Sequence, residues 1–301
     1  MPKPLAKKIA LVLSAIGLLC VGYGYFIEPH RLVVTQQNIQ IENWNPAFDG
    51  FRIAMIADIH GGSNGVTSEK LQEIVRRVNE QNVDLVVMLG DYVSQAHTGG
   101  PIADRPLKMP MSEIADGLAG ITAKHGVLCV FGNHDGYYGD ELIAAELERV
   151  GYKVLQNEVE TITRDGQPLR ILGLKDHLKL TDGWTRTAAE VRELIRTTGA
   201  GDVVILEHSP DTLQTVTGYL SVGPELKLFL AGHTHGGQIW LPLLGTPAIP
   251  SSYGQRYARG HVKENGVDMF VTSGIGESLL PFRFMVPPEI AVITIRSARS
   301  S

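Results

Sequence analysis

The sequence predicts an α/β fold in which apolar strands alternate with amphipathic helices. Five segments of strand length are apolar and rich in β-branched residues, and four segments with apolar residues at helical spacing lie among them. Strands that are apolar on both faces belong to sheets that other layers cover on both sides. No linker, low-complexity tract or internal repeat divides residues 40–298, so we expect a single domain there.

The strand predictions depend on apolar runs that end abruptly in small or polar residues. An earlier segment, RLVVTQQNIQIENW, alternates enough to form a first strand, and DMFVTSG and EIAVITIR are shorter strand-like pieces near the end. The five central runs are FRIAMIADIH (51–60), VDLVVMLGDY (83–92), GVLCVFGNHD (126–135), DVVILEH (202–208) and LKLFLAGHTH (226–235).

The helix predictions depend on apolar residues three and four positions apart and on capping residues. TSEKLQEIVRRVNEQN begins with a Thr that can cap the first turn, and its apolar residues recur at helical spacing. Three more segments follow the same pattern: MSEIADGLAGITAKHG, DELIAAELERVG and TAAEVRELIRTTGAG.

Composition argues against some classes of function. The chain has 301 residues, of which 44% are hydrophobic, and a formal net charge of −5. An acidic chain without a basic block beyond its N-terminus lacks the electrostatic footprint of a nucleic-acid-binding protein. Its two cysteines, Cys20 and Cys129, have neither CxxC nor zinc-ribbon spacing. We infer no obligate protein partner.

The N-terminal segment has the features of an uncleaved membrane anchor. Three lysines precede Ile9–Ile27, an uncharged stretch that as a helix is roughly 28 Å long, close to the hydrocarbon thickness of a bilayer. A cleavable signal peptide is the alternative, but its apolar region is usually shorter and ends in a small-residue site that this segment lacks. We therefore expect residues 1–30 to cross the plasma (inner) membrane once.

Charges around this segment set the expected orientation. Lysines before a span favour a cytoplasmic N-terminus, so the domain from about residue 40 is expected on the extracytoplasmic side. Arg31, just after the span, argues in the opposite direction. Tyr23, Tyr25 and Phe26 gather at the far end of the span, as aromatic residues do at membrane interfaces.

Side chains that can bind metal ions follow the five central strands where each strand ends. In open α/β sheets, ligands bind beyond the carboxyl ends of the strands. Each motif alone is typical of an ordinary turn or helix cap, but half of the ten histidines fall at these five ends. Imidazole and carboxylate groups on rigid strand ends suit transition-metal ions. The candidates are Asp58, His60, Asp91, Asn133, His134, His208, His233 and His235.

The spacing of His233 and His235 favours two ions over one. Side chains at i and i+2 of an extended segment point the same way and lie roughly 6.5 Å apart, which is a long reach for one ion. Two ions about 3.5–4 Å apart, as in two-metal hydrolases, suit that separation better. Gly90, Gly132 and Gly232 precede candidate ligands and allow the close backbone approach that a crowded site needs.

The order of these motifs resembles that of the calcineurin-like metallophosphoesterase superfamily, over about residues 50–298: D-x-H, G-D, G-N-H-D, a later strand-end His and G-H-x-H. The tail is similar to that of small bacterial membrane-associated phosphoesterases, through GHTHGGQIWLPLLGTPAIP, QRYARG and SGIGESLLPFRFMVPPEI. The resemblance implies a four-layer α/β/β/α sandwich after one N-terminal transmembrane helix. It also implies a metal-dependent phosphoric ester hydrolase.

The resemblance further implies a role for each candidate. Two divalent ions (Mn²⁺, Fe²⁺ or Zn²⁺) would be bridged by Asp91 and would hold a hydroxide that attacks phosphorus. His134 would protonate the leaving oxygen or steady charge on phosphorus, and Asp135 would orient its imidazole. The remaining ligands divide between the ions, with Asp58, His60 and His235 on the first and Asn133, His208 and His233 on the second.

Other positions have weaker claims. Arg256 in GQRYARG and Arg283 in LLPFRFM could each bind a substrate phosphate through paired hydrogen bonds. Asp176 and His177, at the end of another strand, either border the pocket or lie in a solvated loop. Two loops rich in Leu, Phe and Pro, IWLPLLGTPAIP and SLLPFRFMVPP, either pack at the sheet edge or form an apolar rim that accepts a lipid phosphate ester.

These expectations converge on a dinuclear metal-dependent phosphohydrolase of the phosphodiesterase type. An alternative is a lipid-linked diphosphate hydrolase such as a UDP-2,3-diacylglucosamine pyrophosphatase, an activity that some relatives have. Another is a binding protein that keeps the fold without catalysis. Such proteins usually lose ligands or the non-ligand histidine, and this chain keeps every one, which favours the enzyme.

Overall fold

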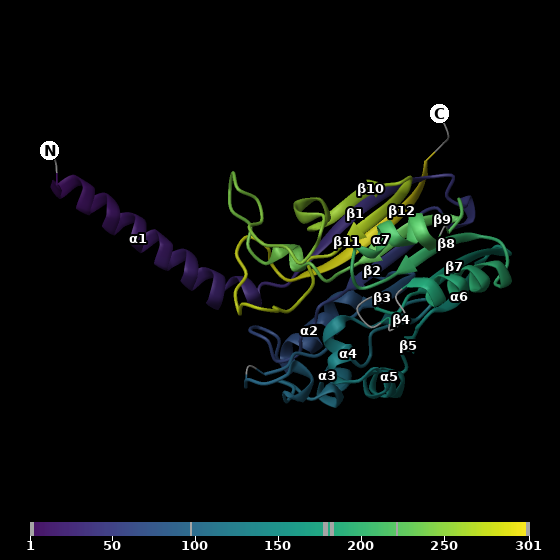
Figure 1. The fold of residues 1–301 in the computed structure, drawn as a ribbon, viewed down its shortest axis with the longest axis horizontal. Helices are drawn as coiled ribbons and strands as arrows, with labels where there is room; N and C mark the ends of the chain where they lie inside the picture. The colour runs from purple at the N-terminus through teal and green to yellow at the C-terminus, as the bar shows by residue number, and fades with distance from the viewer. Residues whose placement is uncertain (1–2, 97, 177–179, 181–183, 221, 299–301) are drawn as a thin grey trace.

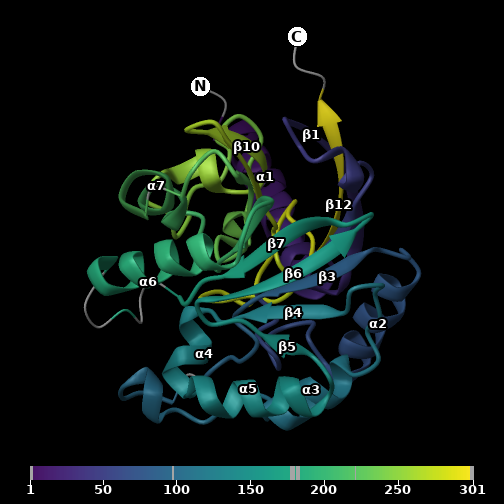
Figure 2. The ribbon, with the colours of Figure 1, turned by 90° about the vertical axis from the view of Figure 1, so that its right-hand side faces the viewer.

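The computed structural model describes residues 3–96, 98–176, 180, 184–220 and 222–298. Two six-stranded mixed sheets pack face to face, and helices cover the outer face of each sheet (Figures 1 and 2). This arrangement confirms the predicted four-layer α/β/β/α sandwich.

The first sheet carries the strands from the two ends of the domain at one edge. Its order is β1 (Val33–Glu42), β12 (Glu289–Ala298), β2 (Arg52–Ile56), β3 (Leu85–Leu89), β4 (Val127–Val130) and β5 (Lys153–Val154). β12 is antiparallel to β2, and the other neighbouring pairs are parallel. The carboxyl ends of β2, β3 and β4 therefore lie along the same edge.

The second sheet has antiparallel strands at both edges and parallel strands in its centre. Its order is β10 (Gly260–Glu264), β11 (Val267–Val271), β9 (Leu226–Ala231), β8 (Asp202–Leu206), β7 (Gln167–Gly173) and β6 (Glu158–Arg164). β8 and β9 are parallel neighbours, so their carboxyl ends also meet at one edge.

The helices divide between the two outer faces. α2 (Ser68–Asn79), α3 (Met111–Leu118) and α5 (Asp140–Arg149) pack on the first sheet, and α6 (Trp184–Thr197) and α7 (Thr212–Thr215) pack on the second. Thr67 caps α2 as predicted, because its hydroxyl accepts a hydrogen bond from the Lys70 N–H. The GNHD segment enters a short helix, α4 (Asn133–Tyr138), which Asn133 begins.

Alternation along the strands explains why both sheet faces are apolar. In β2, Ile53 and Met55 point into the core between the sheets, whereas Ala54 and Ile56 point toward the helices. All four side chains are completely buried. The core between the sheets holds the two layers together and fixes the relative positions of their carboxyl ends.

α1 (Lys3–Phe26) projects away from the sandwich (Figure 1). The segment Leu5–His30 is long and apolar enough to cross a membrane, with a mean hydropathy of 2.0, and it is almost entirely exposed within the chain. β1 enters the first sheet at Val33, earlier than the expected start of the domain at residue 40. Only a short connection therefore separates α1 from the sandwich.

Candidate metal centre

The five central strand ends converge on one place. Asp58 and His60 follow β2, Asp91 follows β3, and Asn133 and His134 begin α4 directly after β4. From the second sheet, His208 follows β8, and His233 and His235 follow β9. The structure thus brings together all eight candidates that the sequence placed at strand ends.

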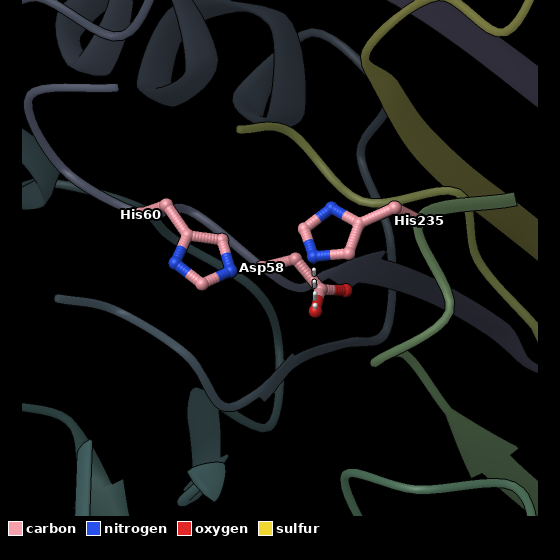
Figure 3. A group of neighbouring side chains, drawn as sticks. All are labelled: Asp58, His60 and His235. Atoms are coloured by element: carbon pink, nitrogen blue, oxygen red, sulfur yellow. Dashed lines mark ion pairs between the residues drawn. The ribbon is translucent and has the colours of Figure 1, made fainter. Parts of the chain in front are cut away.

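One cluster contains Asp58, His60 and His235, whose ligand atoms all lie within 4.8 Å of one another (Figure 3). The Nε2 atom of His235 is 3.5 Å from Oδ1 of Asp58. All three residues are buried. These are the three side chains that the resemblance assigns to a first ion.

A second cluster contains Asp91, His208 and His233, again with ligand atoms within 4.8 Å of one another. Nε2 of His208 is 3.2 Å from Oδ2 of Asp91, and Nδ1 of His233 is 3.1 Å from Nε2 of His208. Asn133, which the resemblance adds to this group, has a buried Oδ1 without a hydrogen-bond partner among the described residues.

Asp91 connects the two clusters. Its Oδ2 atom lies 3.2 Å from His208 Nε2 in the second cluster and 3.5 Å from His60 Nε2 in the first. His60 Nε2 is itself a buried nitrogen without a hydrogen-bond partner within the described chain. Buried polar atoms that lack a protein partner are candidates for binding an ion.

Backbone carbonyls set the tautomer of three histidines. Nδ1 of His60 lies 3.2 Å from the Val93 carbonyl oxygen, Nδ1 of His208 lies 2.8 Å from that of Leu89, and Nδ1 of His235 lies 3.0 Å from that of Gly276. A carbonyl only accepts, so Nδ1 carries the proton and donates it in each ring. The Nε2 lone pairs are left for the centre, as in metal-binding histidines.

The backbone at the candidate ligands is strained. Thirteen described residues other than glycine have a positive φ, and five of them are candidate ligands: Asp58, His60, Asp91, His233 and His235. A positive φ reduces the stability of the folded chain by about 1–3 kcal/mol for each such residue. Strained residues of this kind are frequent at functional sites. Packing around the strand ends therefore holds these side chains in place at the expense of stability.

Burial and neighbouring charges shift the pKa values of the cluster in both directions. Burial disfavours a charged His208, but the Asp91 charge raises the pKa of His208 well above its usual range. Burial raises the pKa of Asp58 to about 7, and the neighbouring Asp91 charge adds to that shift. Burial lowers the pKa of His60 to about 3 and that of His235 well below its usual range, so both rings are neutral and can donate lone pairs. Burial opposes ionisation of Asp91 as well, but interactions with His208 and His134 hold its pKa well below the usual range.

The ligand atoms of His134, His60 and Asp91 also lie within 4.8 Å of one another, and the His134 ring is held by a side chain rather than by a backbone carbonyl. Its Nδ1 lies 2.9 Å from Oε1 of Gln95, and the Gln95 amide also donates to the His134 carbonyl oxygen at 3.0 Å. The His134 N–H donates to Oδ1 of Asp91 at 2.8 Å. Sequence reasoning missed Gln95, because no local motif marks a loop glutamine that meets its partner 39 residues away.

Asp135 does not orient His134, contrary to the expectation from the resemblance. Its carboxylate is completely buried and accepts hydrogen bonds from the backbone N–H groups of Asp91, Tyr92 and Gly132, at 2.8–2.9 Å. Because α4 begins beside the turn that follows β3, the first helical turn aims this side chain at the backbone around Asp91. Asp135 therefore fixes the position of Asp91.

Neither predicted arginine lies in the lining of the cleft. The guanidinium of Arg283 is completely buried and donates to the carbonyl oxygens of Val286, Ser273 and Gly276. Since Gly276 also accepts from His235, Arg283 braces the turn that holds this histidine. Arg256 forms an ion pair with Glu264, whose side chain is mostly buried. Asp176 is buried, and His177 lies outside the described residues.

A cleft of about 460 Å³ opens over the cluster. One side carries polar side chains, and Asp91, Asn133, His134, His233 and His235 line it. The other side is mostly apolar, with Ile239, Pro247, Ala248, Ile249, Pro250, Leu279 and Leu280. Both candidate ion positions are therefore accessible to a ligand that has an apolar part.

Comparison with known families decides the class of protein. Residues 51–237 match the family described as calcineurin-like phosphoesterase. The chain belongs to this family. The match covers every strand end that carries a candidate ligand.

Named relatives agree with this assignment. The chain is 32% identical to the Bacillus subtilis metallophosphoesterase YkuE, over 92% of this chain and 90% of the relative. It is 28% identical to the Escherichia coli phosphodiesterase YaeI, over 91% of this chain and 92% of the relative. It is also 27% identical to a Danio rerio transmembrane protein with a metallophosphoesterase domain, over 96% of this chain and 62% of that one.

Family membership and geometry together define the enzyme class. As a metallophosphoesterase, the chain is a metal-dependent phosphoric ester hydrolase. The two clusters, which Asp91 connects, indicate a dinuclear site for divalent ions. Nitrogen and oxygen donors of this kind are compatible with Mn²⁺, Fe²⁺ and Zn²⁺.

Proposed function

We propose that this metallophosphoesterase is a dinuclear phosphohydrolase of the phosphodiesterase type. Asp91 would bridge the two ions, Asp58, His60 and His235 would complete the ligands of the first ion, and Asn133, His208 and His233 would complete those of the second. The observation that carries the proposal is the position of Asp91, whose Oδ2 lies within 3.5 Å of one histidine from each cluster. The diester preference is supported by the relative named phosphodiesterase YaeI.

Two divalent ions, when bound, lower the pKa of a water molecule and neutralise the charge of the phosphate. The chain supplies the remaining chemistry. His134 lines the cleft beside Asp91 and delivers a proton to the leaving oxygen. Gln95 holds Nδ1 of this ring, so that Nε2 is the atom that faces the substrate. Asp135 and Arg283 position the ligands without touching the substrate.

Hydrolysis by the full-length chain tests this function. The detergent-solubilised protein is stripped of metal with a chelator, reloaded with Mn²⁺, Fe²⁺ or Zn²⁺, and assayed with bis-p-nitrophenyl phosphate and p-nitrophenyl phosphate. We expect the diester to be hydrolysed faster than the monoester and the stripped protein to be inactive. Absence of hydrolysis with all three metals would contradict the proposal.

We also propose that residues 1–30 are a single-pass anchor in the inner membrane and that the domain after them, which includes β1 from Val33, is catalytic and extracytoplasmic. The length and apolar surface of α1 support the anchor, as does the Danio rerio relative that is named a transmembrane protein. The lysines that precede the span support the orientation.

A further inference from the structure

Exposed apolar side chains gather on two loops beside the cleft, residues 238–245 and 278–285, here called the rim loops. Outside the N-terminal residues 5–27, nine large hydrophobic side chains of the described chain are exposed, and five of them lie on the rim loops: Leu243, Leu244, Leu279, Leu280 and Met285. Leu243 is fully exposed, and Leu279 is 84% exposed. A concentration of this kind marks an interaction surface.

The rim loops form one connected unit. The side-chain amide of Gln238 donates to the carbonyl oxygens of Leu280 and Phe282, at 2.9 and 3.0 Å. The Trp240 N–H donates to the carbonyl oxygen of Phe284 at 2.9 Å. These bonds hold the two loops that carry the exposed apolar side chains against each other.

The C-terminal end of α1 is attached to this unit (Figure 1). The Arg283 N–H donates to the Gly24 carbonyl oxygen at 3.0 Å, and Asn64 bridges the carbonyl oxygens of Tyr25 and Pro281. Helix and loop pack so closely that a Cβ atom on Gly24 would collide with the ring of Phe282. If α1 crosses a bilayer, the membrane surface therefore lies at the level of the rim loops.

Backbone strain gives an independent reason to assign a role to these side chains. Leu243 and Met285 both have a positive φ, of 73° and 57°. Glycine or asparagine ordinarily occupies such positions in exposed turns. A large apolar side chain is costly there in two ways, because its backbone is strained and its surface is exposed to water. A bilayer would remove the second cost.

The cleft continues from the candidate metal centre to the rim loops. Ile239, Leu279 and Leu280 line its apolar side and belong to these loops. A ligand whose phosphate reaches Asp91 can therefore extend its apolar part toward the surface on which α1 ends.

We propose that the rim loops lie in the interfacial layer of the bilayer and that the cleft takes its phosphoester from that bilayer. The substrate is an amphiphile whose phosphate lies at the metal centre and whose hydrocarbon chain lies along Ile239, Ile249 and Leu279. Water forms a new P–O bond as the P–O bond to the leaving alcohol breaks, and that alcohol takes a proton. This inference rests on the proposed function, because it names the substrate class of the same site.

Fluorescence quenching tests the membrane contact without any need for activity. The full-length chain is placed in nanodiscs of phosphatidylcholine, in which brominated lipid replaces part of the ordinary lipid. Trp240 lies on a rim loop, whereas Trp44 is buried near the core between the sheets. We expect brominated lipid to quench the wild type clearly more than Trp240→Phe. Equal quenching of the two proteins would overturn the placement of the loops in the bilayer.

A matched pair of diesters tests the substrate class. Methyl p-nitrophenyl phosphate and hexadecyl p-nitrophenyl phosphate share a leaving group and differ in their chain. With the hexadecyl ester in nanodiscs, we expect its kcat/KM to exceed that of the methyl ester at least about tenfold. The double variant Leu243→Glu, Leu244→Glu should lose about tenfold toward the hexadecyl ester and keep activity toward the methyl ester within about twofold. Neither leucine lines the cleft.

The control variant is Leu142→Glu, which charges an exposed leucine on α5 that lies outside both rim loops and the cleft lining. It should leave both activities unchanged. The lipid substrate is wrong if the methyl ester is hydrolysed but the hexadecyl ester is not preferred. It is also wrong if the double variant Leu243→Glu, Leu244→Glu loses activity toward both esters equally. In both cases the proposed function stands. If neither ester is hydrolysed, the proposed function and the lipid substrate both fail, and quenching still decides whether the loops contact the bilayer.

Discussion

His134 is the side chain whose removal separates metal binding from turnover. It lines the cleft and is held by Gln95, but it is not among the seven proposed ligands. We expect His134→Ala to keep its metal and to lower kcat for bis-p-nitrophenyl phosphate by about 10²–10⁴, which is the usual contribution of a general acid. Metal analysis and steady-state kinetics check this. The control is His261→Ala, which removes a histidine that pairs with Asp268 on the second sheet. An unchanged kcat in His134→Ala would show that His134 does not act as the general acid.

Glu277 is a buried carboxyl that couples stability to pH. Its side chain is 1% exposed and faces Arg283 and Lys108, and burial raises its pKa to about 7 from an ordinary value of 4.5. The folded chain therefore holds a proton that the unfolded chain releases between these two pH values. The neutral Glu277 carboxyl stabilises the folded state fully at pH values below 4.5, the pKa of this group in the unfolded chain. This stabilisation is lost as the pH rises through about 7.

Glu277→Gln keeps this position neutral at every pH. We expect the variant to be more stable than the wild type by about 3 kcal/mol near pH 8 and equally stable near pH 4. Denaturant unfolding of the two proteins in the same detergent measures the difference. A stability difference that does not change with pH would show that the charge of Glu277 is not responsible.

The turn between β4 and α4 has to pass very close to Asp91. A Cβ atom on Gly132 would collide with Oδ1 of Asp91, whereas an added Cβ on Gly218 meets nothing within 4 Å. We expect Gly132→Ala to lose bound metal and hydrolysis, because the turn or the carboxylate must move, while Gly218→Ala keeps both. Metal content after dialysis distinguishes the two variants. Full metal occupancy in Gly132→Ala would show that the close approach of Gly132 to Asp91 is not needed for metal binding.

The sequence was informative about elements wherever a local pattern carries the information. Apolar runs that end at Asp58, Asp91 or His208 predict buried strands and their polar ends without any knowledge of pairing. Asp135 and Gln95 differ, because their partners depend on how α4 docks against the turn after β3. The segment LLPFRFM suggested a phosphate contact for Arg283, but a local sequence cannot reveal that its guanidinium donates to backbone carbonyl oxygens instead.

At the scale of the whole molecule, the order of the strands was not readable from local patterns. β1 and β12 pair in parallel although Val33 and Glu289 stand at opposite ends of the domain, and such pairing depends on long-range packing. The four layers followed from the family resemblance and from strands that are apolar on both faces. The position of α1 against the rim loops required the structure, since the contacts to Gly24 and Tyr25 come mainly from residues far along the chain.

Fusion proteins test the orientation of the whole chain. If the lysines near the start of α1 keep the N-terminus in the cytoplasm, as proposed, alkaline phosphatase fused to the C-terminus should be active and a green fluorescent protein at the same position should be dark. Enzymatic activity and fluorescence of intact cells provide the readout. A fluorescent fusion together with an inactive phosphatase would place the catalytic domain in the cytoplasm.

Metal content of Asp91→Ala tests the bridged two-ion centre most directly. The full-length wild type, loaded with Mn²⁺ and dialysed, should hold about two ions per chain, as two-metal hydrolases do. Asp91→Ala should hold far fewer than two and should not hydrolyse bis-p-nitrophenyl phosphate, whereas Asp116→Ala, at an exposed carboxylate that pairs with Arg149, should match the wild type. Retention of two ions per chain in Asp91→Ala would contradict the bridging role.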